Sequence, residues 1–295
     1  MSSLNQNCNI DKTKYYAMTI QHFILTRFNV LLWRKAKDGN PVRTRAWLEH
    51  RFAIFERYCL PSVMGQTCKD FQWLVLFDST TPEIYRERVE RYRKMCPQFV
   101  PVYVEPREGR NFAQIFRIQV AERLHADRVV TTYFDNDDAL HTGFVEDVQR
   151  RAKGLPDGTF INYNHGYQLY TDYNYVMRIH YPTNHFQSVV ESAGDFKTVF
   201  GYGSHAYIHK IKGVRIENVK NVPMWCENVH ERNMANDAYF IRGVRMMKDP
   251  QLLRRDFGLD VTVSSGPGLL LLRFLPRYAR TFMVRVKYFF FGRHW

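Results

Sequence analysis

Apolar residues along the first half of the chain alternate between strand-like runs and helix-like spacing. Short runs rich in β-branched and aromatic residues predict strands over residues 20–28, 71–77, 99–104 and 128–134. Apolar residues that recur at helical spacing predict helices over residues 47–58, 82–95 and 111–124. This alternation is typical of an α/β fold with a Rossmann-like, mostly parallel sheet and helices on both faces.

The pattern changes after about residue 155, where short aromatic segments replace the alternation. They predict strands over residues 159–163, 167–170 and 175–180, with a turn at Asp172-Tyr173-Asn174. We therefore expect a smaller antiparallel addition to the sheet. A helix is expected near Asn236–Met247, and beyond Asp260 the chain is basic and apolar without an acidic residue.

Composition limits the class of protein and its partners. With 295 residues and 45% apolar residues, the chain is long enough to bury a substantial core. Its 42 Lys and Arg against 29 Asp and Glu give a net charge of +13, which favours anionic partners such as phosphates, nucleic acid or acidic lipid headgroups. The five cysteines form no CxxC pair, and the first residues lack a signal-peptide pattern. We expect a cytoplasmic protein without a membrane span.

An acidic cluster, Asp135-Asn136-Asp137-Asp138, follows the predicted strand 128–134 directly. In α/β sheets of this kind, ligands bind beyond the carboxyl ends of the strands. Three carboxylates at close range repel one another, and a divalent cation such as Mg²⁺ or Mn²⁺ removes that repulsion. The cluster predicts a metal site with Asp135 and Asp137 as leading ligands and Asp138 as a further one. The alternative is a solvated turn that caps the next helix.

Motifs of other enzyme classes are absent from the sequence. There is no GxxxxGK[ST] phosphate loop, no GxGxxG after the first predicted strand, no HExxH pair and no GxSxG elbow. The sequence therefore gives little support to a kinase, a dinucleotide-dependent oxidoreductase, a zinc protease or a serine hydrolase.

The order of these elements carries a family resemblance. The segments 23–27, 74–78 and 109–111, with Arg117, and then the acidic cluster, resemble GT-A glycosyltransferases. More narrowly, residues 20–240 resemble the rhamnosyltransferases of bacterial polysaccharide clusters. The later segments that take part in this resemblance are Met224-Trp225-Cys226-Glu227, His230-Glu231 and Asn236-Asp237.

The resemblance implies a GT-A domain over residues 1–260, with a nucleotide-sugar half over about 20–150 and an acceptor half over about 151–260. It implies that Asp78 contacts the base or ribose of the donor and that Thr26 and Arg27 face the nucleotide. Asp135 is expected to contact the donor as well as the metal, and Arg117 is a candidate for neutralising donor phosphate. The alternatives are that the strand-end residues only cap a turn and that Arg117 is a solvated helix residue.

The acceptor side of the resemblance is less specific. Asp237 is the preferred general base, with Glu231 and Glu227 in reserve, and His230 is the preferred auxiliary metal ligand. Capping of a helix is the alternative role of Asp237. Neither an acidic ED pair nor a QxxRW signature of large inverting families follows downstream.

The expected activity is metal-dependent transfer of a sugar, rhamnose by the name of the family, from a nucleoside-diphosphate donor to a saccharide or lipid-linked saccharide in cell-surface polysaccharide synthesis. The tail, residues 261–295, mixes arginines with apolar residues and suits a peripheral position on the anionic inner face of a membrane; a packed terminal helix is its alternative. A nucleic-acid-binding module and a membrane-bound, non-catalytic protein are the rival functions. Neither rival needs three carboxylates at a strand end, and we expect no nucleic-acid partner.

Overall fold

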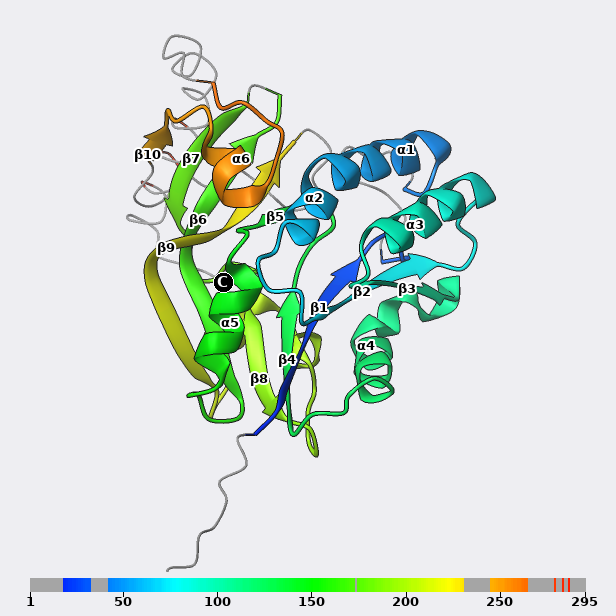
Figure 1. The fold of residues 1–295 in the computed structure, drawn as a ribbon, viewed down its shortest axis with the longest axis vertical. Helices are drawn as coiled ribbons and strands as arrows, with labels where there is room; N and C mark the ends of the chain where they lie inside the picture. Colours follow the sequence, from blue (N-terminus) through cyan, green and yellow to red (C-terminus); the bar gives the residue numbers. More distant parts are fainter. Residues whose placement is uncertain are drawn as a thin grey trace, which may run out of the picture.

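The computed structural model describes residues 18–32, 42–172, 174–230 and 245–264, with isolated positions at Ala279, Met283 and Val286. These residues form a mixed α/β fold around one ten-stranded sheet with helices on both faces (Figure 1). The predicted fold class is confirmed. Within the described part of the chain, no helix has both the length and the apolar character needed to cross a bilayer.

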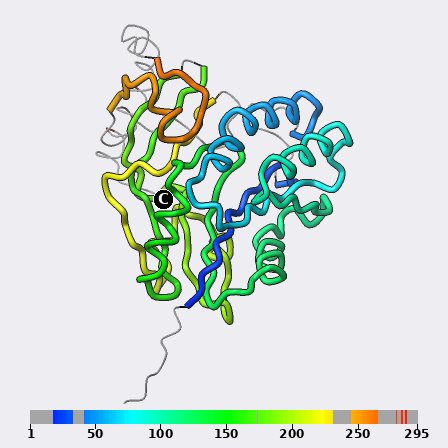
Figure 2. Tube along the Cα trace, viewed as in Figure 1, coloured from blue at the N-terminus to red at the C-terminus, as the bar shows by residue number. Residues whose placement is uncertain are grey.

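The N-terminal half of the sheet is parallel. Its strands are β1 (Ile20–Arg27), β2 (Gln72–Asp78), β3 (Phe99–Val104) and β4 (Arg128–Tyr133). They lie in the order β4-β1-β2-β3, so that β1 is paired on both sides. Each begins and ends within one residue of its prediction. In the tube of Figure 2, the dark blue β1 runs through the middle of the molecule.

Alternation along β1 explains the two layers of helices. Phe23 and Leu25 are fully buried in the cluster that contains α4 (Phe112–Ala121). Ile24, between them, is buried in the cluster on the opposite face. That second face is covered by α1 (Arg45–Ile54), α3 (Glu83–Met95) and α5 (Phe144–Ala152). Both faces are covered, so these strands read as continuous apolar runs rather than alternating ones.

The helix that precedes β2 is longer than expected. The sequence predicts residues 47–58, whereas α1 continues through a π-helical turn, η1 (Phe55–Cys59), into α2 (Leu60–Met64). Pro61 lies near the start of α2, directly after this π-helical turn. A proline within a continuous helix lacks the N–H for one backbone hydrogen bond. The hydroxyl of Thr44 accepts from Trp47 N at 3.2 Å and caps the start of α1.

The second half of the sheet is mainly antiparallel, as expected. Its strands are β5 (Ala139–Leu140), β6 (Thr159–Tyr170), β7 (Tyr175–His180), β8 (Ser188–Ser192), β9 (Arg215–Val229) and β10 (Arg245–Met247). β8 joins it to β4 with antiparallel pairing, and β6 pairs with β7, β8 and β9. β5 and β10 pair with the ends of β9 and β7.

Two expectations for this half are corrected. The predicted strands 159–163 and 167–170 form one strand, because β9 stays paired with β6 across two register shifts. The helix expected near Asn236–Met247 does not include its last three residues, which form β10 on the edge of β7. Residues 231–244 lie outside the described part of the chain, as does most of the predicted tail.

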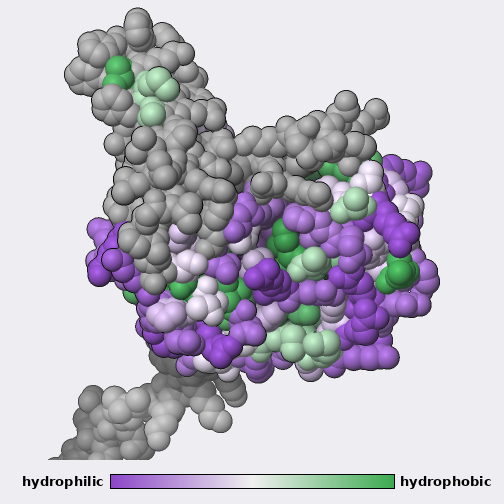
Figure 3. All heavy atoms as spheres, turned by 90° about the horizontal axis from the view of Figure 1, so that it is seen from above, coloured by the Kyte–Doolittle hydropathy of each residue, from purple (hydrophilic) through white to green (hydrophobic). Residues whose placement is uncertain are grey.

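The remaining segments pack against these two halves. The 3₁₀ turns are η2 (Pro106–Asn111), η3 (Val199–Tyr202) and η4 (His205–Lys210). The last described helix, α6 (Leu252–Phe257), is orange in Figure 2 and packs against β6, β7 and the α1–η1 segment. On the face shown in Figure 3, the described surface is mostly hydrophilic, and its apolar positions are scattered.

Candidate active site

The acidic cluster lies where the sequence places it, in a turn between β4 and β5. Phe134 N donates to Leu25 O at 3.1 Å, so the carboxyl ends of β1 and β4 stay side by side as they enter this turn. In chain order, the first and last residues of the turn, Asp135 and Asp138, form an outer pair. The two middle residues, Asn136 and Asp137, form an inner pair. The side chains of the two pairs have different partners.

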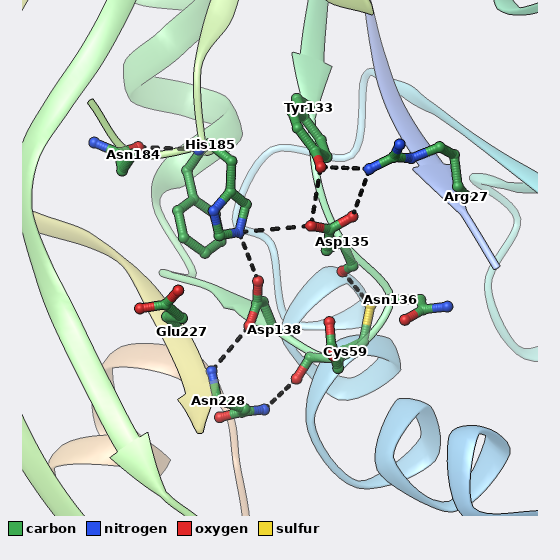
Figure 4. A network of polar contacts seen from close by, with 12 residues as sticks. Arg27, Cys59, Tyr133, Asp135, Asn136, Asp138, Asn184, His185, Glu227 and Asn228 are labelled. Carbon is green, nitrogen blue, oxygen red and sulfur yellow. Dashed lines mark hydrogen bonds and ion pairs between the residues drawn. The ribbon is translucent and has the colours of Figure 1, made fainter. Parts of the chain in front are cut away.

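The outer pair converges on a histidine from the antiparallel half (Figure 4). His185 lies between β7 and β8, and its Nε2 is 2.8 Å from Asp138 Oδ2 and 3.8 Å from Asp135 Oδ2. One ligand atom from each of the three residues lies within 4.8 Å of the others. Asp138 and His185 are buried, whereas the Asp135 side chain is 31% exposed. The three side chains offer two carboxylates and one imidazole to a cation that approaches past Asp135.

Burial and their mutual hydrogen bond shift the pKa values of Asp138 and His185. Burial raises the pKa of Asp138 to about 8, against the effect of its hydrogen bond with His185. Burial lowers the pKa of His185, but the bond to Asp138 and the nearby carboxylates outweigh it and raise that pKa to about 9. Asp138 Oδ1 also accepts from Asn228 N at 2.9 Å. A cation needs an ionised carboxylate and a neutral imidazole, so one that binds here would displace the protons that these raised pKa values favour.

Arg27 brings a positive charge to the same edge. It ends β1, and its Nη2 lies 2.5 Å from the Tyr133 hydroxyl and 3.4 Å from Asp135 Oδ1. Its guanidinium also lies 4.8–5.2 Å from the ring centroids of Phe112, Tyr133 and Phe200. These rings and the Tyr133 hydroxyl restrict where the guanidinium lies beside Asp135.

The inner pair of the turn points toward α1. Arg51 Nη1 donates to Asp137 Oδ2 at 2.8 Å and to Asn136 Oδ1 at 3.0 Å. His230 Nε2 lies 3.4 Å from Asp137 Oδ2. Although burial opposes ionisation, the charge of Arg51 and the contact with His230 hold the pKa of Asp137 well below its usual range. The predicted ligands Asp137 and His230 thus lie together, but with Arg51 rather than with His185.

The other predicted donor-side residues are dispersed along this edge. The Thr26 hydroxyl is buried and accepts from Trp73 Nε1 at 2.9 Å, on the face covered by α1 and α3. Asp78 ends β2; its Oδ1 accepts from Thr80 N at 2.8 Å, and its Oδ2 lies 2.8 Å from Arg43 Nη2. Arg117 is exposed on α4. Of the four described residues that were predicted to lie on the donor side besides Asp135, namely Thr26, Arg27, Asp78 and Arg117, Arg27 is the one whose side chain contacts the acidic turn.

One of the three predicted bases is described. Glu227 lies near the end of β9, is buried, and accepts from Gln168 Nε2 at 2.6 Å. Burial raises its pKa, and the charge of His185 and the hydrogen bond from Gln168 oppose that shift. Figure 4 shows it beside Asp138 and His185. Glu231 and Asp237 lie outside the described residues.

Sequence reasoning missed His185 and Arg51. His185 is a single histidine in the segment Thr183-Asn184-His185-Phe186, more than forty residues from the acidic cluster. Arg51 is one of two arginines in α1, a helix whose other buried residues are apolar. The only local signal for His185 is the polar pair that it forms with Asn184, and such pairs are common in loops.

The chain belongs to the family described as "Putative rhamnosyl transferase", whose sequence profile matches residues 23–241. No curated protein matches the chain.

Several solved structures are similar to this chain at low identity. S. aureus TarS, residues 1–349, has a TM-score of 0.40 at 11% identity, with 70% of this chain and 60% of that chain covered. The same protein in complex with UDP has a TM-score of 0.42, with 72% and 61% covered. Mouse xyloside xylosyltransferase 1 has a TM-score of 0.29 at 10% identity, with 53% and 57% covered. The chain therefore spans about three fifths of the TarS chain that it matches.

Proposed function

We propose that the enzyme transfers rhamnose from a nucleoside-diphosphate sugar to a hydroxyl of a saccharide or lipid-linked saccharide, in the synthesis of a cell-surface polysaccharide. The sugar rests on the description of the family. The observation that carries the donor side of the proposal is the convergence of Asp135, Asp138 and His185 at the carboxyl end of β4. Arg27 lies at the same point and adds a positive charge for the diphosphate.

The chemistry of this donor set fits a divalent cation. Two carboxylates suit Mg²⁺ and Mn²⁺, and the imidazole favours Mn²⁺, because Mg²⁺ prefers oxygen ligands alone. Asp135, Asp138 and His185 would hold the ion. When bound, the cation stabilises negative charge on the leaving diphosphate as a Lewis acid.

The chain's own residues would then bind and orient the donor. Arg27 is placed to pair with a phosphate oxygen, since its guanidinium already lies beside Asp135. Asp78 is the proposed contact of the base or ribose, and releasing it from Arg43 would accompany that contact. Two further residues remain proposed neighbours of the nucleotide. Thr26 lies at the end of β1, and Arg117 lies on α4.

In the transfer, the acceptor oxygen bonds to the anomeric carbon while the bond between that carbon and the diphosphate oxygen breaks. The acceptor's proton passes to a carboxylate, and the nucleoside diphosphate leaves. We propose Glu227 for this proton, because it lies beside the Asp138–His185 pair and its raised pKa suits a proton acceptor. Asp237 and Glu231 remain the other proposed bases.

A donor panel tests the proposal. The purified protein is mixed with dTDP-, UDP- and GDP-sugars, with Mn²⁺, Mg²⁺ or a chelator, and release of the nucleoside diphosphate is measured. We expect release with one donor, dependent on the cation. Asp138→Asn should abolish it, whereas Asp195→Asn, which changes an exposed carboxyl far from the turn, should not. Full activity in the chelator, or in Asp138→Asn, contradicts the metal-dependent mechanism.

A separate experiment tests attachment to a membrane. We propose that the tail, residues 261–295, binds anionic lipid through its arginines and apolar side chains. Full-length protein should pellet with vesicles that contain phosphatidylglycerol, and a truncation after Gly266 should stay in the supernatant. Equal pelleting of a folded truncation contradicts this role of the tail.

A further inference from the structure

The inner half of the acidic turn is fastened to three separate elements. One nitrogen of Arg51, on α1, donates to both Asn136 and Asp137. Asn136 Nδ2 in turn donates to Phe28 O, after β1, at 2.7 Å. Asn228, on β9, donates from its amide to Asp137 O. The turn is therefore held through its side chains from α1 and from the residue after β1, and through a backbone carbonyl from β9.

Burial makes the Arg51–Asp137 contact a strong constraint. Arg51 is 6% exposed and Asp137 is 8% exposed. Of the described carboxylates, Asp137 is the one within ion-pair distance of Arg51. The guanidinium also lies 5.3 Å from the ring centroid of Trp47, one turn earlier on α1. Removing Arg51 would leave the buried Asp137 carboxylate with His230 alone, and removing the Asp137 charge would leave the buried Arg51 guanidinium without its described carboxylate. Both changes are costly.

The direction of Asp137 decides which side chains remain for a cation. Its carboxylate faces α1, whereas the carboxylates of Asp135 and Asp138 face His185. We propose that Arg51 is a positioning residue, which holds Asp137 as an anchor of the turn and thereby leaves the cation to Asp135, Asp138 and His185. The anchor itself is independent of the proposed function, but its consequence for the cation rests on that function.

The consequence departs from the expectation for the acidic cluster, in which Asp137 is a leading ligand. Asp137 and Arg51 carry opposite charges, so replacing both leaves the net charge near the cation unchanged. A loss of cation affinity in the double variant Arg51→Met/Asp137→Asn therefore reports a change in the position of the donor side chains, and not a change in the electrostatic attraction of the cation. The three donor side chains are still present in that variant, so binding should be weakened rather than abolished.

Thermal unfolding of the full chain tests the anchor. We expect Arg51→Met and Asp137→Asn each to lower Tm by about 6 °C or more. The double variant should melt at a higher temperature than either single variant, because neither charge is left alone. Arg51→Lys, which keeps a donor, should melt between wild type and Arg51→Met. Arg45→Met, at the exposed start of the same helix, is the matched control and should change Tm little. Additive losses in the double variant overturn the anchor.

Mn²⁺ titration, followed by calorimetry or electron paramagnetic resonance, tests the consequence. The double variant should bind Mn²⁺ about tenfold more weakly than wild type, the size typical for residues that orient metal ligands. Asp138→Asn should show no binding. Binding lost as completely in the double variant as in Asp138→Asn makes Asp137 a ligand and overturns the inference. Binding equal to wild type shows that Arg51 positions nothing, and also overturns it.

These readouts separate the inference from the proposed function. A wild-type protein that binds neither Mn²⁺ nor Mg²⁺, with or without a nucleoside diphosphate, contradicts the proposed metal dependence. The melting temperatures then decide the anchor alone: recovery in the double variant supports it, and additivity overturns it.

Discussion

The two halves of the sheet contribute to the site in different ways. In the parallel half, Arg27 and Asp135 follow strand ends that the chain's own pattern of apolar residues predicts. In the antiparallel half, His185 comes from a loop before β8 and Glu227 from the end of β9, and neither position follows from a repeating pattern. The parallel half thus sets where a ligand meets the sheet, and the antiparallel half supplies the side chains that complete the site there.

The Trp225 ring packs directly on Gly166, where β9 pairs with β6. A Cβ on Gly166, in β6, would lie 2.2 Å from Trp225 Cδ2, and the Trp225 ring stacks on Phe186 at 4.8 Å. We expect Gly166→Ala to lower the free energy of unfolding by about 3 kcal/mol or more, because β6 and β9 must separate. Urea unfolding measures it, with Gly154→Ala as the control, since its Cβ meets no atom closer than 3.9 Å. A stable Gly166→Ala variant would show that Trp225 moves aside easily.

His185 tests whether the antiparallel half is as necessary for activity as the parallel half. We expect His185→Ala to lower kcat/KM about 100-fold, or about 2.7 kcal/mol of transition-state stabilisation, as a loss of one of three proposed ligands. His209→Ala, at an exposed position of η4, should keep its activity. Activity near that of wild type in a folded His185→Ala variant would show that His185, from the antiparallel half, is not needed for activity.

The core of the parallel half contains a buried histidine that makes it sensitive to acid. Burial lowers the pKa of His22 to about 3, and its Nε2 lies 2.7 Å from Thr132 Oγ1. In the unfolded chain the pKa is about 6.5, so below that pH the unfolded state binds a proton that the folded state excludes. Stability is therefore present in full above pH 6.5 and falls by about 1.4 kcal/mol per pH unit below it, or about 2 kcal/mol by pH 5.

Urea unfolding at pH 7.5 and pH 5 measures this loss. His22→Gln should reduce the difference between the two values, whereas His209→Gln, an exposed histidine, should leave it unchanged. The same acid sensitivity in His22→Gln would assign it to other groups.

The smallest effect expected concerns the start of α1. The Thr44 hydroxyl caps this helix, which carries Arg51. Thr44→Ala should cost about 1 kcal/mol of stability, whereas Thr44→Ser, which keeps the hydroxyl, should cost little. A thermal melt of both variants checks this. A change in Mn²⁺ affinity as large as that of an Arg51 variant would show that the helix start, and not the arginine, orients the turn.

Much of the donor side could be predicted because strand ends are local features. The runs before Asp78 and Asp135 are apolar and short, and a parallel sheet brings such ends to one edge. The same reasoning could not show which way a side chain turns there. The Thr26 side chain points to Trp73, because side chains alternate between the two faces of a strand. The Asp137 side chain points to Arg51, because the backbone conformation of the turn sets its direction.

The sequence by itself determined the α/β class, the parallel strands, the place of the acidic turn and the resemblance to rhamnosyltransferases. Those properties depend on hydrophobic periodicity and on residues that are neighbours in the chain. Only the tertiary structure decided that Asp138 pairs with His185, that Arg51 forms an ion pair with Asp137, and that β6 is one unbroken strand beside β9. The residues in these contacts are between 47 and 86 positions apart in the chain. Their formation depends on how whole strands and helices pack, which no local pattern records.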